Sequence, residues 1–264
     1  MRCALIGFGG LGRIVAEHLS REPDIRVVAV AARAHQSKGV RALLGDASIV
    51  GSAAALLDLE PDLVVECASH GAFREYAEPV LSAGVNLIAV SVGVLADAHY
   101  RERVLTAART AGSSLEIPAG AIGGIDAVAA ARTAGLSRVA YVTRKNPKAW
   151  SGTPAETMFD IGNVAAPHLF FDENAERAAL VFTDKANVCA TLALAGVGFE
   201  HTRVQFWVDA AVTRSIHHIE AEGPCGTLKV ELGNNVAPSD GKASLLTAMS
   251  IVRAVRNRSA TLRI

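Results

Sequence analysis

The sequence predicts an α/β domain at the N-terminus, followed by an α+β domain with an open mixed or antiparallel sheet. Up to residue 118, short β-branched runs alternate with helical stretches, and a glycine cluster follows the first of these runs. Beyond residue 118, long runs of alternating polarity follow one another closely. We expect a first domain at 1–118, a second at 119–242, and a helix at 243–257 that packs back on the first.

The segment "GFGGLG" at residues 7–12 lies between an apolar strand at 3–6 and apolar residues at helical spacing. In a strand-turn-helix, the first glycine allows a tight turn, the second lets a pyrophosphate approach the backbone, and the third allows the helix to pack on the strand. Phosphates then bind at the helix N-terminus. The sequence thus predicts a Rossmann dinucleotide-binding domain, and a glycine turn without a ligand is the alternative. The predicted cofactor-binding loop consists of Gly7, Gly9, Gly10, Leu11 and Gly12.

Further strands of the first domain are expected after this loop, with helices between them. The strands are expected at 25–30, 61–68, 85–90 and 113–118, and the helices at 73–84 and 97–112. This order indicates a parallel sheet, whose ligands bind at the carboxyl ends of the strands. We therefore assign Ala68 to cofactor binding and keep His70 as a minor candidate for substrate binding.

The second domain is expected to begin with a helix of small residues and a long strand. The helix is expected at 123–135 and the strands at 136–145, 202–212, 213–223 and 226–232. Close succession of the last three favours antiparallel pairing. Val204, Phe206 and Val208 fall on one face of their strand, which helices of the same chain or a second copy must cover.

Composition limits the class of partner. Lys plus Arg and Asp plus Glu number 26 each, so no overall charge favours nucleic acid or an anionic membrane, and a small molecule is expected. The four cysteines lack C-x-x-C spacing and no leader precedes the first strand, which predicts a reducing cytoplasm. The longest apolar run is too short to span a bilayer. The cysteine, histidine and carboxylate residues are not clustered at the spacing that is typical of a metal site, so none is expected.

Five motifs together resemble one enzyme family. "GFGGLG", "PAGAIGGIDA", "AWSGTPAE", "DKANVCATLALAGVG" and "TRSIHHIE" occur in the order and at the separations typical of L-aspartate dehydrogenases that use NAD or NADP. The resemblance extends over nearly the whole chain. It implies oxidative deamination of L-aspartate to oxaloacetate and ammonia through iminosuccinate. It also implies that the second domain builds the substrate site and a homodimer interface.

The same resemblance implies that His217 is catalytic. Hydride leaves an amino acid only after a base has taken a proton from its ammonium group, and water must then add to the imine. A histidine suits both transfers because its ordinary pKa lies near neutrality. Strand alternation places His217 with Ser215 and Ile219, and His218 with Glu220 on the other face. A packed structural histidine is the alternative, and relatives often carry Asn where this chain has Ser215.

The resemblance further implies that the nicotinamide contacts the backbone N–H of Ala121 and the side chain of Asn187. The alternative for the Ala121 segment is a tight turn without a ligand, and the alternative for Asn187 is the N-cap of a helix. Substrate carboxylates need cations and hydrogen-bond donors, for which we consider Lys145, Ser151 and Thr153. A solvated strand tip is the alternative for the lysine.

Coenzyme choice is indicated by the end of the second strand. NAD-preferring sites carry Asp or Glu there, whereas this chain has Ala31, Ala32 and Arg33. Arg33 can pair with a 2′-phosphate, so NADP should be accepted at least comparably with NAD, unless Arg33 is only an exposed loop charge.

Two other functions are compatible with the sequence. One is a different two-domain nicotinamide enzyme, dihydrodipicolinate reductase-like or homoserine dehydrogenase-like. The other is a dinucleotide-sensing protein without turnover.

Overall fold

The computed structural model describes residues 1–235 and 244–264. The chain divides into two compact units, each with its own sheet. The first unit contains residues 1–120 and 247–264, and the second contains 121–235 and 244–246. The domain boundary expected at 242/243 lies outside the described residues.

The first unit is built on a six-stranded parallel sheet in the order β3-β2-β1-β4-β5-β6. Its strands are β1 Arg2–Ile6, β2 Arg26–Ala31, β3 Ser48–Val50, β4 Leu63–Glu66, β5 Asn86–Ala89 and β6 Leu115–Glu116. Most of their residues are buried, because helices pack on both faces and the strands are continuous apolar runs. The strand order is that of a dinucleotide-binding fold, which confirms the predicted fold class.

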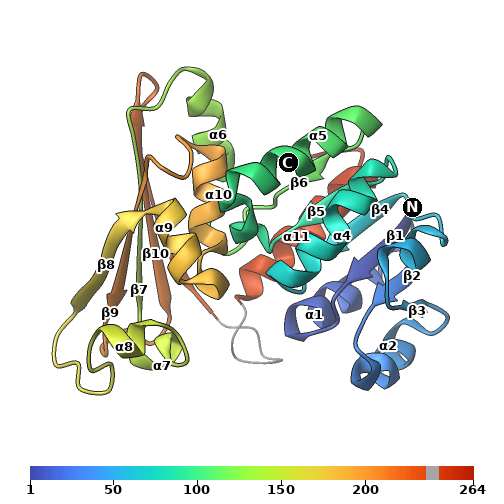
Figure 1. Ribbon diagram of the computed structural model, residues 1–264, viewed down its shortest axis with the longest axis horizontal. Coiled ribbons are helices and arrows are strands. Elements are labelled where there is room, and N and C mark those ends of the chain that lie inside the picture. The colour runs from blue at the N-terminus through green and yellow to red at the C-terminus, as the bar shows by residue number, and fades with distance from the viewer. Residues whose placement is uncertain (236–243) are drawn as a thin grey trace. The chain divides into compact units, whose positions relative to one another are not determined.

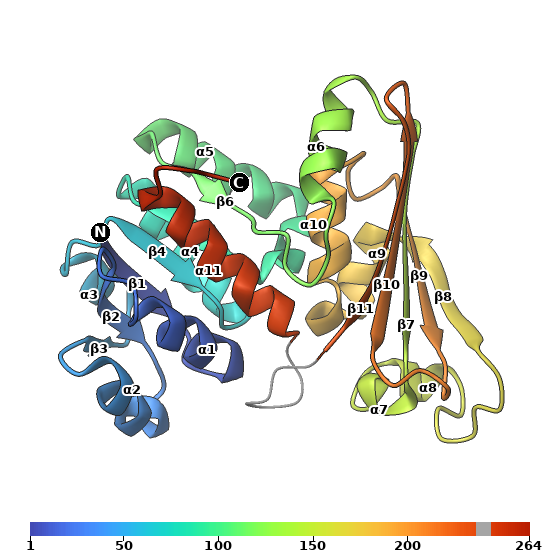
Figure 2. The same ribbon diagram turned by 180° about the vertical axis from the view of Figure 1, so that it is seen from behind.

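Helices α1 (Gly10–Leu19) and α11 (Leu245–Ser259) cover one face of this sheet, and α4 (His70–Ser82) and α5 (Ala98–Ala111) cover the other (Figures 1 and 2). Helix α11 supplies Ile251 and Val255 to the same core cluster as Cys3 and Leu5 of β1. From Thr247 onward, the carboxyl-terminal helix is therefore part of the first unit. The shorter helices are η1 Ala34–Gln36, α2 Ser37–Leu44, α3 Ala53–Leu57 and η2 Val92–Ala96.

The second unit is built on a five-stranded mixed sheet in the order β11-β10-β7-β9-β8. Its strands are β7 Arg138–Lys145, β8 His168–Asn174, β9 Thr202–Val208, β10 Ser215–Gly223 and β11 Gly226–Asn234. Strands β7 and β9 run parallel, and the other neighbouring pairs are antiparallel. The mixed sheet of the second domain is thus confirmed. The antiparallel pairing expected from close succession holds for β10 and β11 but is wrong for β9 and β10, because β7 lies between them.

Helices of the second unit lie along one face of its sheet (Figure 1). They are α6 Ile125–Thr133, α9 Ala175–Val181 and α10 Asn187–Ala195, with the short α7 Pro147–Trp150, α8 Ala155–Met158 and η3 Thr183–Lys185. Val204, Phe206 and Val208 are fully buried on the helix-covered face, where Phe206 contacts Trp150 with ring centroids 5.2 Å apart. Helices of the same chain therefore cover this apolar face, so it gives no reason for a second copy.

Candidate active site

The glycine turn between β1 and α1 has a separate steric reason at each glycine. Gly7 has φ +97°, and a side chain there would come within 2.6 Å of the Ala68 Cβ. A side chain at Gly12 would overlap the Gly7 carbonyl, which allows α1 to approach the strand closely. Around Gly9, no atom lies within 4 Å of an added Cβ, so the backbone there is open to a ligand. This geometry matches a pyrophosphate cradle.

Helix α1 begins directly after this turn, with Gly9 as its N-cap residue and Gly10 and Leu11 in its first turn. Gly9 makes no side-chain cap, so backbone N–H groups at this end are available to an anion. A groove of about 430 Å³ opens beside the turn. The predicted cofactor residues that line it are Gly7, Gly9, Arg33 and Ala68. These residues fit a dinucleotide.

Arg33 follows β2 and is exposed at the groove, where Ala31 and Ala32 stand in place of an acidic residue. Glu75 of α4 also lines the groove. His70 begins α4 and does not line the groove, so it remains only a minor prediction for the substrate.

In the second unit, strands β7 and β10 bring four side chains together. His217 pairs with Thr143 across the two strands, and Tyr141 and Lys145 share that face of β7 because they lie two residues to either side. His217 is 3% exposed. Its Nδ1 lies 2.7 Å from the Tyr141 hydroxyl, and the two rings stack at 6.0 Å. Nε2 is therefore the ring nitrogen left for chemistry.

The charges of this cluster are strongly perturbed. Burial, helped by the charge of Lys145, lowers the pKa of His217 to about 3. Burial, helped by the charge of Lys185, lowers the pKa of Lys145 to about 8. His217 is thus neutral near pH 7, with a pKa well below the near-neutral value expected from the sequence. Lys145 keeps most of its charge at pH 7, which suits it to bind an anion.

Helix α10 begins beside this cluster. It starts at Asn187 with Ala186 as its N-cap residue, so the interpretation of Asn187 as the helix N-cap is wrong. The Cys189 thiol donates to the Ala186 carbonyl at 3.0 Å, and burial raises its pKa to about 12. Helix α10 packs against β7, the strand that carries Tyr141 and Lys145.

Ala121 lies in a tight turn at the start of the second unit. It is buried, and its carbonyl accepts a hydrogen bond from Asn234 Nδ2 at 2.5 Å. Gly120 and Gly124 flank it with positive φ angles, as a tight turn of small residues requires. Asn234, at the end of β11, fixes this turn and was missed by the sequence analysis.

Ser151 and Thr153 make local hydrogen bonds after β7. Ser151 donates to Glu156 at 2.8 Å, and Thr153 donates to the Trp150 carbonyl at 2.6 Å. Their roles in substrate binding stay predictions. Arg144 points to the other face of β7, where it lies 3.7 Å from Asp209.

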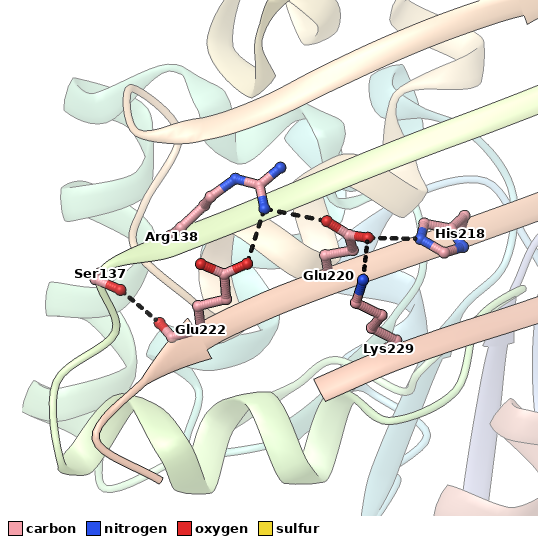
Figure 3. A network of polar contacts seen from close by, with 6 residues as sticks. All are labelled: Ser137, Arg138, His218, Glu220, Glu222 and Lys229. Carbon is pink, nitrogen blue, oxygen red and sulfur yellow. Dashed lines mark hydrogen bonds and ion pairs between the residues drawn. The ribbon is translucent and has the colours of Figure 1, made fainter. Parts of the chain in front are cut away.

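His218 points away from His217, as strand alternation predicts. Its Nε2 lies 3.2 Å from Glu220, which also pairs with Lys229 and Arg138 on a face that no helix among the described residues covers (Figure 3). The hydrogen bond with His218, together with Lys229 and Arg138, lowers the pKa of Glu220 to about 2. This network belongs to the surface of the sheet and not to the His217 cluster.

Comparison with known proteins shows the family to which the chain belongs. A family model described as "Aspartate dehydrogenase, C-terminal" matches residues 126–258. Proteins named L-aspartate dehydrogenase from Ralstonia pickettii and Polaromonas sp. are 39% and 40% identical, over 98% and 99% of both chains respectively. The chain belongs to the aspartate dehydrogenase family. The family predicted from the motifs is thereby confirmed, and the chain is an NAD(P)-dependent oxidoreductase.

Two further similarities concern the fold. Residues 7–118 match a family model described as "Homoserine dehydrogenase, NAD binding domain". The aspartate dehydrogenase of Thermotoga maritima superposes with a TM-score of 0.76 at 24% identity, covering 100% of this chain and 99% of that one. Within the described residues, no helix has the length and apolar character needed to cross a membrane. The same residues contain no group of three or more side chains arranged to hold a metal ion.

Proposed function

We propose that the chain oxidises L-aspartate with NAD or NADP to oxaloacetate and ammonia, through iminosuccinate. The observation that carries the proposal is the His217 ring, which contacts Tyr141 on the strand face that also carries Lys145, in a chain whose relatives are named L-aspartate dehydrogenase over nearly their full length. Oxidation of an amino dicarboxylate needs a base for the ammonium group and a cation for a carboxylate. His217 and Lys145 supply these two groups.

The first unit holds the coenzyme in this proposal. Bound NAD or NADP supplies the hydride acceptor. The backbone from Gly7 to Gly12 receives the pyrophosphate at the start of α1, and Ala68 forms the wall beside it. Arg33 binds the 2′-phosphate, so NADP should be used at least comparably with NAD. A preference for NAD of a hundredfold or more in kcat/KM would show that Arg33 does not do this.

His217 carries the proton transfers. In the tautomer in which Nδ1–H donates to the Tyr141 hydroxyl, Nε2 is unprotonated, and this nitrogen takes the proton from the substrate ammonium. The free amine can then lend its lone pair as hydride leaves Cα. The ring releases that proton to solvent, and Nε2 then takes a proton from the water that adds to iminosuccinate. The ring returns this proton to the amino group, the C–N bond breaks, ammonia leaves, and the remaining hydroxyl loses its proton to give the ketone of oxaloacetate. Ser215 shares this face of β10 with His217.

Lys145 binds a substrate carboxylate, and Ala121 and Asn187 contact the nicotinamide. The support for Lys145 is its place on the same strand face as Tyr141 and its positive charge below a pKa of about 8. Support for Asn187 is its position at the start of α10, a helix that packs against β7. Ser151 and Thr153 complete the substrate loop only if their local hydrogen bonds rearrange.

Assembly and location are the remaining proposals. We assign a homodimer through the second unit, on the family resemblance alone. The helix-free face of its sheet carries the charged network of Figure 3. A monomer mass by light scattering at micromolar concentration would contradict the assignment. The cytoplasm is the proposed location because all four cysteines are free thiols.

A spectrophotometric screen of amino acids with each coenzyme tests the activity. Reduction of NAD or NADP with L-aspartate is expected, and homoserine as the preferred substrate would favour the homoserine dehydrogenase-like alternative. Coenzyme binding without turnover of any amino acid would favour a sensor. His217→Ala should lower turnover by about a hundredfold or more with little change in coenzyme affinity. His218→Ala should keep most activity, and the reverse pattern would contradict the assigned base.

A further inference from the structure

A buried carboxylate stands at the carboxyl end of β4, beside the coenzyme groove. Glu66 is 1% exposed. One oxygen, Oε1, accepts hydrogen bonds from the N–H groups of Ala68 at 2.7 Å and Ser69 at 3.0 Å, and from the Ser91 hydroxyl at 2.8 Å. The other, Oε2, accepts from the Ser91 N–H at 3.0 Å. A single side chain thus binds the segments that follow two neighbouring strands, β4 and β5.

The segment that Glu66 holds forms one wall of the groove. Ala68 and Ser69 both line it, together with Gly7 and Gly9. An added Cβ at Gly7 would meet the Ala68 Cβ at 2.6 Å, so Ala68 already packs against the turn that receives the pyrophosphate. The segment also pairs with β1, because the Cys67 N–H donates to the Ile6 carbonyl at 3.0 Å. A shift of Ala68 would therefore change the space beside the glycine turn.

We propose that Glu66 is a positioning residue for the coenzyme. Its carboxylate holds the loops after β4 and β5 in the conformation that receives NAD or NADP, without touching the coenzyme itself. This inference rests on the proposed use of the groove by the coenzyme. Burial of a carboxylate costs free energy, and this one lies at the edge of the sheet where α/β proteins bind ligands.

The chemistry of the site requires a carboxylate. All four donors point at its two oxygens, and a carboxylate presents acceptors on both. A glutamine presents an acceptor on one side only, and its NH₂ group would face either the Ser91 N–H or the two N–H groups after β4. An aspartate is one methylene shorter and cannot reach both segments from the same backbone position. Burial raises the pKa of Glu66, and the hydrogen bonds from its neighbours oppose this shift.

The test is coenzyme affinity, measured by NADH and NADPH fluorescence on the full chain at a temperature where circular dichroism shows each variant folded. Glu66→Gln should weaken binding by about ten- to a hundredfold, the range expected when hydrogen bonds to a buried charged group are lost. Ser91→Ala removes the hydroxyl donor but keeps the N–H, so this variant should lose less coenzyme affinity than Glu66→Gln does. Glu102→Gln is the control, because this exposed glutamate pairs, among the residues that the structure describes, with Thr106 and Arg109 of its own helix α5.

A merely structural role predicts a different pattern. Glu66→Gln would then have a lower melting temperature but a dissociation constant within twofold of the wild type, and that result would overturn the proposal. If Glu66→Gln does not fold, Ser91→Ala decides: unchanged affinity in that variant also overturns it. The substrate assignment is separable, since a wild type that binds coenzyme but does not oxidise L-aspartate contradicts the proposed activity and leaves this binding test intact.

Discussion

Acidification should destabilise the second unit through His217. Burial holds the pKa of this histidine at about 3 in the folded chain, against about 6.5 for an unperturbed histidine. Between these values the unfolded chain binds a proton that the folded chain does not, so stability is full above the unfolded pKa and falls as pH decreases towards the folded one. At pH 5 the loss is about 2 kcal/mol, from about 1.4 kcal/mol for each pKa unit.

The assay is urea unfolding at pH 7.5 and pH 5 for the wild type, His217→Gln and His218→Gln. His217→Gln lacks the titrating ring, so its stability should fall by about 2 kcal/mol less than that of the wild type over this interval. His218→Gln removes the neighbour on the opposite face and should follow the wild type. If the wild type and His217→Gln lose the same stability, within about 0.5 kcal/mol, the lowered pKa of His217 is refuted.

Three substitutions test the other assigned roles. Gly12→Ala should weaken NADPH binding by about tenfold or more or prevent folding, because its side chain would overlap the Gly7 carbonyl; fluorescence titration with normal affinity would contradict this. Arg33→Ala should lower the ratio of kcat/KM for NADP to that for NAD by about tenfold, and an unchanged ratio would return Arg33 to a loop charge. Lys145→Met should raise the KM for L-aspartate by about ten- to a hundredfold while the Kd for NADH stays unchanged, and a normal KM would remove Lys145 from the substrate site.

Features of the fold that depend on residues close together in the sequence were predictable. The turn at Gly7 and the start of α1 depend on residues within a few positions of one another, and their geometry follows from strand, turn and helix preferences. Strand β10 was likewise predictable with both faces assigned, because alternation alone separates His217 from His218. These signals need no knowledge of what packs against them.

Contacts between distant segments were not predictable. Tyr141 and His217 are 76 positions apart, and Asn234 reaches Ala121 across 113 positions. Both contacts depend on the order of the strands in the sheet and on their register. Neither the order nor the register can be derived from a single sequence. Glu66 and Ser91 are closer, 25 positions apart, but a glutamate at the end of an apolar run has no pattern that marks it as buried.

Strand β8 was missed for a local reason. Its apolar residues Leu169, Phe170 and Phe171 are consecutive, so the segment lacks the alternation of a half-buried strand. The pairing with β9 shifts register between Leu169 and Phe171, and this irregularity interrupts the period of two. Both Phe170 and Phe171 consequently contact Phe206, which strict alternation would not allow.

The side chains proposed for proton transfer lie within the sheet, whereas Ser151 and Thr153, proposed for substrate binding, lie beyond the end of a strand. Strands β7 and β10 each have a neighbour on both sides, so ladder hydrogen bonds fix the spacing of Tyr141, Lys145 and His217. Proton transfer depends on such spacing, because small errors in donor–acceptor geometry are costly to the rate. Ser151 and Thr153 lie beyond the end of β7, where short helices and local hydrogen bonds hold them. Substitution of Tyr141 or His217 should therefore lower turnover. Substitution of Lys145, the last residue of β7, or of Ser151 and Thr153 beyond it should act mainly on substrate affinity.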